Sequence, residues 1–205
     1  MDLCLHIVRL KNLAKIFDLK NLMEDLNRQI KDRNGKILIV GLGSAERGDD
    51  GVGLYIAKRL ACERLPENVE VVLCESEMDL LRLVGTLSVN KDGSADGLPC
   101  HVIFLDAVEF GGREGEIAFL GSEEIKSRFP QVSTHKISLS AIAKYIEANG
   151  KTSVWLIGIQ VKNIRMPSGL SPEVKEAADV LTGLLTRQPG MIIERLSGVG
   201  IINYV

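Results

Sequence analysis

Apolar, β-branched runs alternate with segments of helical spacing along most of this chain. The first such run, Lys36 to Val40, ends at Gly41. An unbroken apolar run of this length is typical of a strand buried on both faces of a sheet. Similar runs predict strands at 69–74, 102–105 (ending at Asp106), 116–120 and 154–159. Helical spacing predicts helices at 51–64, 79–89, 136–148 and 172–185.

This alternation predicts an α/β fold: a doubly wound twisted sheet, mostly parallel with one antiparallel strand, and helices on both faces. The last helix has a clear start signal, with Ser171 as N-cap and Pro172 at the first helical position.

The first 34 residues have a different pattern. Apolar residues recur there at spacings of three to five, which predicts one or two amphipathic helices. We therefore expect an N-terminal helical extension, residues 1–34, before an α/β domain, residues 35–205. The polar side mixes both charge signs, which favours a packed appendage or a partner-binding surface, including self-association, over a membrane anchor.

Composition narrows the functional class. The 205 residues carry 25 Lys plus Arg against 27 Asp plus Glu, so no broad basic surface exists to hold nucleic acid. No apolar run approaches the roughly 20 residues of a membrane span. The four cysteines lack a C-x-x-C spacing, which argues against a zinc finger and for reduced thiols. We expect a cytoplasmic protein.

Three polar residues follow predicted strands or precede a predicted helix. Asp50 lies in the loop after the first strand, Asp106 ends the third, and His135 precedes a later helix. Ligands of open α/β sheets bind beyond the carboxyl ends of the strands. Two carboxylates about 4 Å apart repel by about 4 kcal/mol at an effective dielectric near 20, so they favour a cation between them. With an imidazole they suit a divalent transition metal that could assist hydrolysis.

A nucleotide site is the competing interpretation, because Gly41 and Gly43 follow a strand and Glu75 could meet a ribose hydroxyl. The third glycine of the dinucleotide motif is replaced by Glu46, and acidic residues stand at the helix entrance, where they repel phosphate. The glycines are better explained by sharp turns and close backbone approach. A nucleotide- or adenosylmethionine-binding transferase stays an alternative.

Purely structural roles are open for each candidate. Asp49 or Asp50 could be an N-cap, Asp106 could cap a turn, and His135 could start a helix. For His6 and His101 packing or surface placement is favoured. The functional interpretation therefore depends on Asp50, Asp106 and His135 falling at the same edge of the sheet.

Five ordered motifs, spread from about residue 36 to about residue 185, resemble those of the hydrogenase maturation endopeptidases. They are Gly41-Leu42-Gly43, Gly48-Asp49-Asp50-Gly51-Val52-Gly53, Leu105-Asp106-Ala107-Val108, Ser133-Thr134-His135 before Ser138-Leu139, and Gly158-Ile159-Gln160 with Gly169-Leu170-Ser171-Pro172-Glu173-Val174. The resemblance implies a twisted sheet flanked by helices. It also implies removal of a C-terminal extension from the precursor of a nickel-iron hydrogenase large subunit, after nickel insertion. The family's metal-contacting side chains carry over onto Asp50, Asp106 and His135.

The resemblance further implies that the nickel is presented by the precursor rather than held permanently by the protease. A three-ligand site binds a lone ion weakly but can complete the shell of an ion that a partner presents. Whether nickel or an acidic side chain activates the attacking water stays open. A second hypothesis is a non-catalytic, chaperone-like binder of the metal-loaded precursor.

Overall fold

The structure is a computed structural model that describes residues 7–8, 35–87, 97–128, 138–162 and 169–186. Six strands form one sheet in the order β1-β5-β6-β4-β2-β3. The strands are β1 (Ile7–Val8), β2 (Ile37–Leu42), β3 (Val69–Cys74), β4 (His101–Val108), β5 (Ile117–Gly121) and β6 (Ser153–Gln160). The helices are η1 (Gly48–Gly51), α2 (Val52–Ala61), α3 (Glu77–Thr86), α4 (Ser122–Arg128), α5 (Leu139–Glu147) and α6 (Pro172–Thr186).

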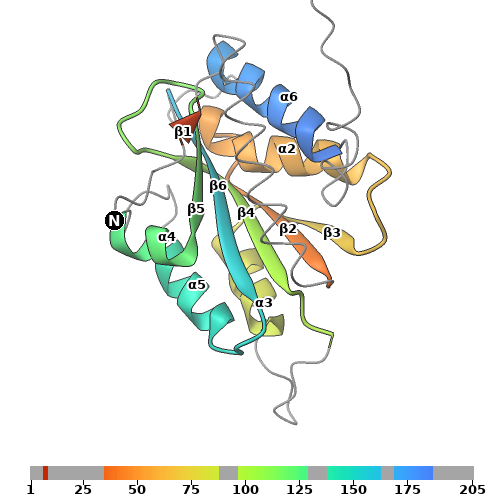
Figure 1. Cartoon of the computed structure of the whole chain (residues 1–205). Coiled ribbons are helices and arrows are strands. Elements are labelled where there is room, and N and C mark those ends of the chain that lie inside the picture. The colour runs from red at the N-terminus through yellow and green to blue at the C-terminus, as the bar shows by residue number, and fades with distance from the viewer. Residues whose placement is uncertain (1–6, 9–34, 88–96, 129–137, 163–168, 187–205) are drawn as a thin grey trace, which may run out of the picture.

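The sheet confirms the predicted fold class. Strand β2 pairs in parallel with β3 and β4, and β4 pairs in parallel with β6. Strand β5 is antiparallel to β6 and to β1, so it alone runs against the rest of the sheet. Figure 1 shows α2 and α6 on one face and α3, α4 and α5 on the other. The chain is therefore a doubly wound α/β protein.

Each face of the sheet has its own apolar layer. Successive strand residues point to opposite faces, and in the central strands both sets are apolar. Ile103 and Leu105 of β4 join the layer under α2 and α6, whereas Val102 and Phe104 join the layer under α3, α4 and α5. This double burial explains why β2 and β4 appear as continuous apolar runs.

The N-terminal segment departs from the prediction at the two positions that the structure describes. Ile7 and Val8 form β1, paired with Ala118 and Ile117 of β5, so the helix prediction is wrong for these two residues. The remainder of 1–34, with His6, lies outside the described residues, and the boundary between 1–34 and 35–205 stays a prediction. Within the described part, no helix has the length and hydrophobicity needed to cross a membrane.

Two further differences concern helices. Helix α3 begins two residues earlier than predicted because the Ser76 hydroxyl accepts a hydrogen bond from Asp79 N–H (3.2 Å) and donates one to the Asp79 carboxylate (2.7 Å). Helix α4 was not predicted, since its seven residues include a single large apolar side chain, Ile125. Cys62, Cys74 and Cys100 are free thiols, as expected.

Candidate active site

Asp50 lies in η1, the short turn between the carboxyl end of β2 and the start of α2. Its side chain is almost fully buried, with 1% exposure. Oδ2 accepts a 3.1 Å hydrogen bond from the backbone N–H of Ser44 and lies 3.7 Å from Nη1 of Arg47. Oδ1 is buried and has no hydrogen-bond partner among the described residues. A buried carboxylate oxygen left in this way costs stability, and such costs are characteristic of ion-binding or catalytic groups.

Asp106 lies inside β4, whereas the sequence predicted that the strand ends at this residue. The strand continues to Val108 because Ala107 and Val108 extend the apolar run. Asp106 is 1% exposed, and its Oδ1 accepts a 2.8 Å hydrogen bond from the backbone N–H of Ala107. Since Phe104 and Val108 belong to the layer under α3, α4 and α5, strand alternation directs the Asp106 side chain to that same face.

Glycines allow the turn that carries Asp50 to lie directly against β4. A Cβ on Gly53 would lie 2.1 Å from the carbonyl oxygen of Leu105 and 2.5 Å from that of Leu42, so only glycine fits there. Gly43 has φ +125°, and a Cβ on it would lie 1.9 Å from the carbonyl oxygen of Asp50. The turn η1 accordingly contacts β4. These contacts support the close-approach explanation of the glycines.

Asp49, the neighbour of Asp50, has a different environment. Its Oδ1 accepts a 2.6 Å hydrogen bond from Ser171 N–H, and its Oδ2 accepts 3.0 Å bonds from Lys162 N–H and the Ser171 hydroxyl. Neither aspartate caps α2, whose N-cap is Gly51 with no side-chain cap bond. Asp49 therefore joins the loop after β2 to the segments beyond β6, while Oδ1 of Asp50 finds no hydrogen-bond partner in the described part of the chain.

Ser171 does precede the first turn of α6, as the sequence predicted. Its carbonyl accepts a 2.8 Å hydrogen bond from the backbone N–H of Lys175. The Ser171 hydroxyl contacts Asp49. The start of α6 is thus anchored to the loop beside the candidate site.

Gln160, at the end of β6, organises the loop that follows β4. Its Oε1 accepts hydrogen bonds from the backbone N–H groups of Phe110 (2.9 Å) and Gly112 (3.1 Å). Its Nε2 donates to Glu109 Oε1 (2.8 Å) and to the carbonyl of Val161 (3.1 Å). Gln160 belongs to the Gly158-Ile159-Gln160 motif, but its four hydrogen bonds could not be predicted from the spacing of that motif.

The third predicted ligand, His135, lies outside the described residues. Within them, no three His, Cys, Asp or Glu side chains form a group that could hold a metal ion. The three-residue metal set therefore stays a prediction. His101 is buried in β4, so of the two expectations for it, packing or surface placement, packing is confirmed.

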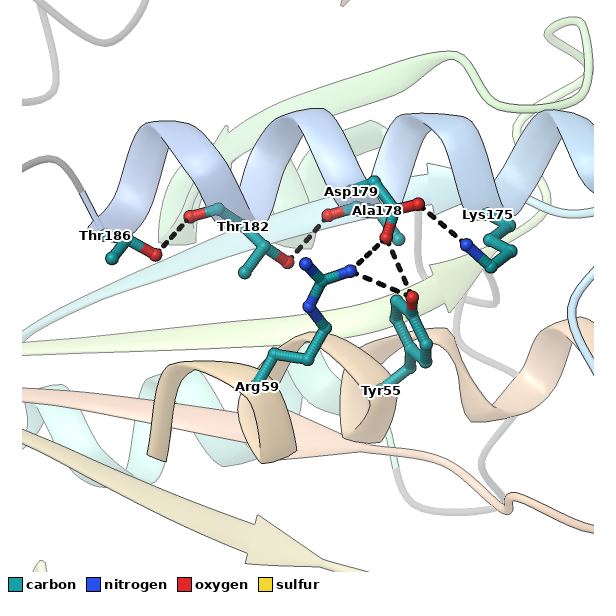
Figure 2. A network of polar contacts seen from close by, with 7 residues as sticks. All are labelled: Tyr55, Arg59, Lys175, Ala178, Asp179, Thr182 and Thr186. Atoms are coloured by element: carbon teal, nitrogen blue, oxygen red, sulfur yellow. Dashed lines mark hydrogen bonds and ion pairs between the residues drawn. The ribbon is translucent and has the colours of Figure 1, made fainter. Parts of the chain in front are cut away.

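A polar network joins α2 to α6 on the face of the sheet opposite Asp106 (Figure 2). The Tyr55 hydroxyl donates a 2.7 Å hydrogen bond to Oδ1 of Asp179, which also pairs with Arg59, while Lys175 lies 2.8 Å from Oδ2. The hydrogen bond from Lys175, with those from Tyr55 and the charge of Arg59, lowers the pKa of Asp179. The arrangement fixes the two helices relative to each other on this face.

The fold and the site together define a class of protein: an α/β protein in which a turn carrying the buried Asp50 contacts β4, which carries the buried Asp106. Comparison with known proteins shows which family within this class the chain belongs to. A family model described as hydrogenase maturation protease matches residues 55–188. A relative from Methanocaldococcus jannaschii, named "Putative hydrogenase maturation protease MJ0631", is 31% identical over 165 residues, which are 78% of this chain and 90% of the relative. The chain belongs to the hydrogenase maturation protease family.

Solved structures agree with this assignment. The NiFe hydrogenase maturation protease HycI from Thermococcus kodakarensis is 28% identical, with a TM-score of 0.59 over 74% of this chain and 90% of that one. The endopeptidase HycI from Escherichia coli shares the fold at 19% identity, with a TM-score of 0.58 over the same shares of the two chains. The expected family is confirmed, and the match to a protease family gives no support to the transferase alternative.

Proposed function

We propose that this protein is an endopeptidase that removes the C-terminal extension of a nickel-iron hydrogenase large-subunit precursor after nickel insertion. In this proposal Asp50, Asp106 and His135 engage the nickel that the precursor carries. One observation carries the assignment to the site: the buried Oδ1 of Asp50, without a hydrogen-bond partner among the described residues, lies on a turn that contacts the strand of Asp106.

The donor set fits this substrate. Carboxylate oxygens with one imidazole nitrogen suit a divalent transition metal, and three ligands leave room for groups of the precursor. Asp106 faces the layer of α3, α4 and α5, and residue 135 stands between α4 and α5 in the chain order. An incomplete set would engage nickel only when the precursor presents it, which makes cleavage follow metal insertion.

Hydrolysis requires a water molecule to attack the peptide carbonyl and lose a proton while the amide nitrogen gains one. The nickel of the substrate would polarise the carbonyl or the water. A carboxylate oxygen outside its shell, on Asp50 or Asp106, would accept the proton and return it to the leaving nitrogen. The products are a mature subunit with a new C-terminal carboxylate and a released extension with a free amine.

The proposal is tested by incubating the protein with nickel-loaded and nickel-free precursor and weighing the products by mass spectrometry. We expect the nickel-loaded precursor to become shorter by the length of the extension, and the nickel-free precursor to stay intact. Asp50→Asn, Asp106→Asn and His135→Ala should abolish the shortening. Equal cleavage of both precursors would refute nickel engagement, and binding without any shortening would establish the chaperone-like alternative.

A further inference from the structure

A cavity of about 270 Å³ lies between the loop after β2, the first turns of α2 and the start of α6. Its position is separate from the face of Asp106, because α2 and α6 cover the opposite side of the sheet (Figure 1). The side chains that line it are those of Ala45, Leu54, Tyr55, Lys58, Leu170 and Lys175.

The volume and lining of the cavity suit an apolar group. Engineered cavities of roughly 150 Å³ hold benzene, so this one has room for a larger apolar side chain. Leu54, Leu170 and the ring of Tyr55 supply apolar surface. The side chains of Lys58 and Lys175 are about half exposed, with 51% and 53% exposure, so they place positive charge where the cavity meets solvent.

The cavity is continuous with the turn that carries Asp50. Gly48 and Gly51, the two ends of that turn, both line it. A group bound in the cavity would therefore contact the backbone on either side of Asp49 and Asp50. The same polypeptide could occupy the cavity and present its adjoining residues to the candidate site.

The two walls of the cavity are held together before any ligand binds. Asp49 accepts hydrogen bonds from the backbone N–H and the hydroxyl of Ser171. Ser171 directly follows Leu170, which lines the cavity. On the other side, the Tyr55 hydroxyl of α2, which also lines the cavity, donates a hydrogen bond to Asp179 of α6 (Figure 2). A preformed cavity lowers the ordering cost of binding.

We propose that this cavity is a recognition subsite for the precursor polypeptide, which inserts an apolar side chain and places a neighbouring carboxylate beside Lys58 and Lys175. This inference rests on the proposed function and names how its substrate is selected. Lys58 pairs with the exposed Glu75 at 2.7 Å, and Lys175 pairs with the partly buried Asp179 at 2.8 Å. An exposed pair such as Lys58–Glu75 contributes little stability, so a substrate carboxylate can replace Glu75 at low cost and share Lys175 with Asp179.

The main test fills the cavity without touching the core. Ala45 is exposed at the cavity edge, so Ala45→Phe places a ring in the proposed subsite. With nickel-loaded large-subunit precursor from the same organism, we expect KM to rise at least tenfold and kcat to stay within twofold. A fall in kcat with unchanged KM would overturn the proposal, because it would indicate a disturbed Asp50 turn instead of lost docking.

A matched pair of charge reversals tests the lysine contribution. Lys58→Glu should raise KM at least threefold. Lys36→Glu breaks a similarly exposed pair, with Glu70, at the opposite end of the strands and makes the same change in net charge, so its KM should equal that of the wild type. Equal KM values for the two variants, or a wild-type KM in Ala45→Phe, would overturn the proposal.

Direct binding separates this inference from the proposed function. Isothermal titration of the same precursor should give at least tenfold weaker binding for Ala45→Phe than for the wild-type protein. If the wild type binds the precursor without cutting it, the endopeptidase proposal fails. The subsite proposal is then still tested by the difference in affinity between the wild type and Ala45→Phe. If cleavage occurs and binding is equal in both proteins, the subsite fails alone.

Discussion

Ser171 donates two hydrogen bonds to Asp49, from its backbone N–H at 2.6 Å and from its hydroxyl at 3.0 Å, although 122 positions separate the two residues. The loop that bears Asp50 is therefore anchored through Asp49 to the beginning of α6. In the pair Asp49-Asp50 the first carboxylate joins two segments of the fold, whereas Oδ1 of the second has no hydrogen-bond partner among the described residues.

Replacing Asp49 should destabilise the protein. Asp49→Ala removes a buried carboxylate and leaves the partly buried donors of Ser171 and Lys162 without their acceptor, which should lower the free energy of unfolding by about 2–4 kcal/mol. Urea denaturation followed by circular dichroism measures this change. Glu46→Ala removes the same charge from an exposed position of the same loop and should change stability by less than about 0.5 kcal/mol. Equal effects of the two substitutions would refute the anchoring role.

Asp50 should behave in the opposite way. Asp50→Asn removes a buried charge whose Oδ1 has no hydrogen-bond partner among the described residues and keeps an acceptor for Ser44 N–H. The free energy of unfolding should stay within about 1 kcal/mol of the wild-type value or exceed it, while precursor cleavage is lost. The two measurements are urea denaturation and product mass. A loss of stability as large as that of Asp49→Ala would assign Asp50 a structural role.

Gly53 should tolerate no side chain. Its added Cβ would meet the carbonyl oxygens of Leu105 and Leu42, so Gly53→Ala must displace α2 from the sheet and should cost about 2–4 kcal/mol. Gly183→Ala is the matched control, because α6 offers open space there and alanine favours a helix by about 0.5–1 kcal/mol. The midpoint temperature of thermal unfolding should thus fall for Gly53→Ala and rise for Gly183→Ala.

The network around Asp179 should give a pH-dependent contribution to stability. The pKa of this carboxyl is lowered from its ordinary value of 3.8, chiefly by the hydrogen bond from Lys175. A depressed folded-state pKa stabilises the protein above the unfolded value and loses that effect as pH falls through the folded value. The stability difference between wild type and Asp179→Asn should be constant from about pH 8 to about pH 5 and shrink below about pH 4. A difference that grows in acid would contradict this.

The buried thiol of Cys74 should resist alkylation. Burial, with a smaller effect of Asp79, raises the pKa of Cys74 to about 11, so almost no thiolate forms at pH 8. Cys62 is exposed and should react with iodoacetamide first. Peptide mass mapping over time measures the order, and modification of Cys74 as early as Cys62 would refute the burial of this strand end.

Strand β2 could be predicted within a residue or two because its apolar run is buried on both faces. Strand β3, an outer strand of the described sheet, could be predicted to the residue because turn residues bound its apolar run. The end of β4 was misplaced because the carboxylate of Asp106 resembled a strand terminus. Whether a charged residue such as Asp106 ends a strand or lies within it depends on the elements packed around it, which the sequence pattern does not show.

The site was predicted less completely. Spacing could not separate Asp49 from Asp50, because their difference arises from Ser171 and Lys162, which are remote in the chain. The same limit applies to Gln160, whose four partners are fixed by tertiary contacts. His135 stays a prediction, since it lies outside the described residues.

The pairing of Ile7 and Val8 with β5 has a consequence for solubility. An uncovered outer strand presents unpaired amide and carbonyl groups to which strands of other molecules can add. Here Ile7 and Val8 pair with part of the β5 edge, so β1 and β3 are the outer strands of the described sheet. These two residues thus shorten the length of β5 at which strands of other molecules can add.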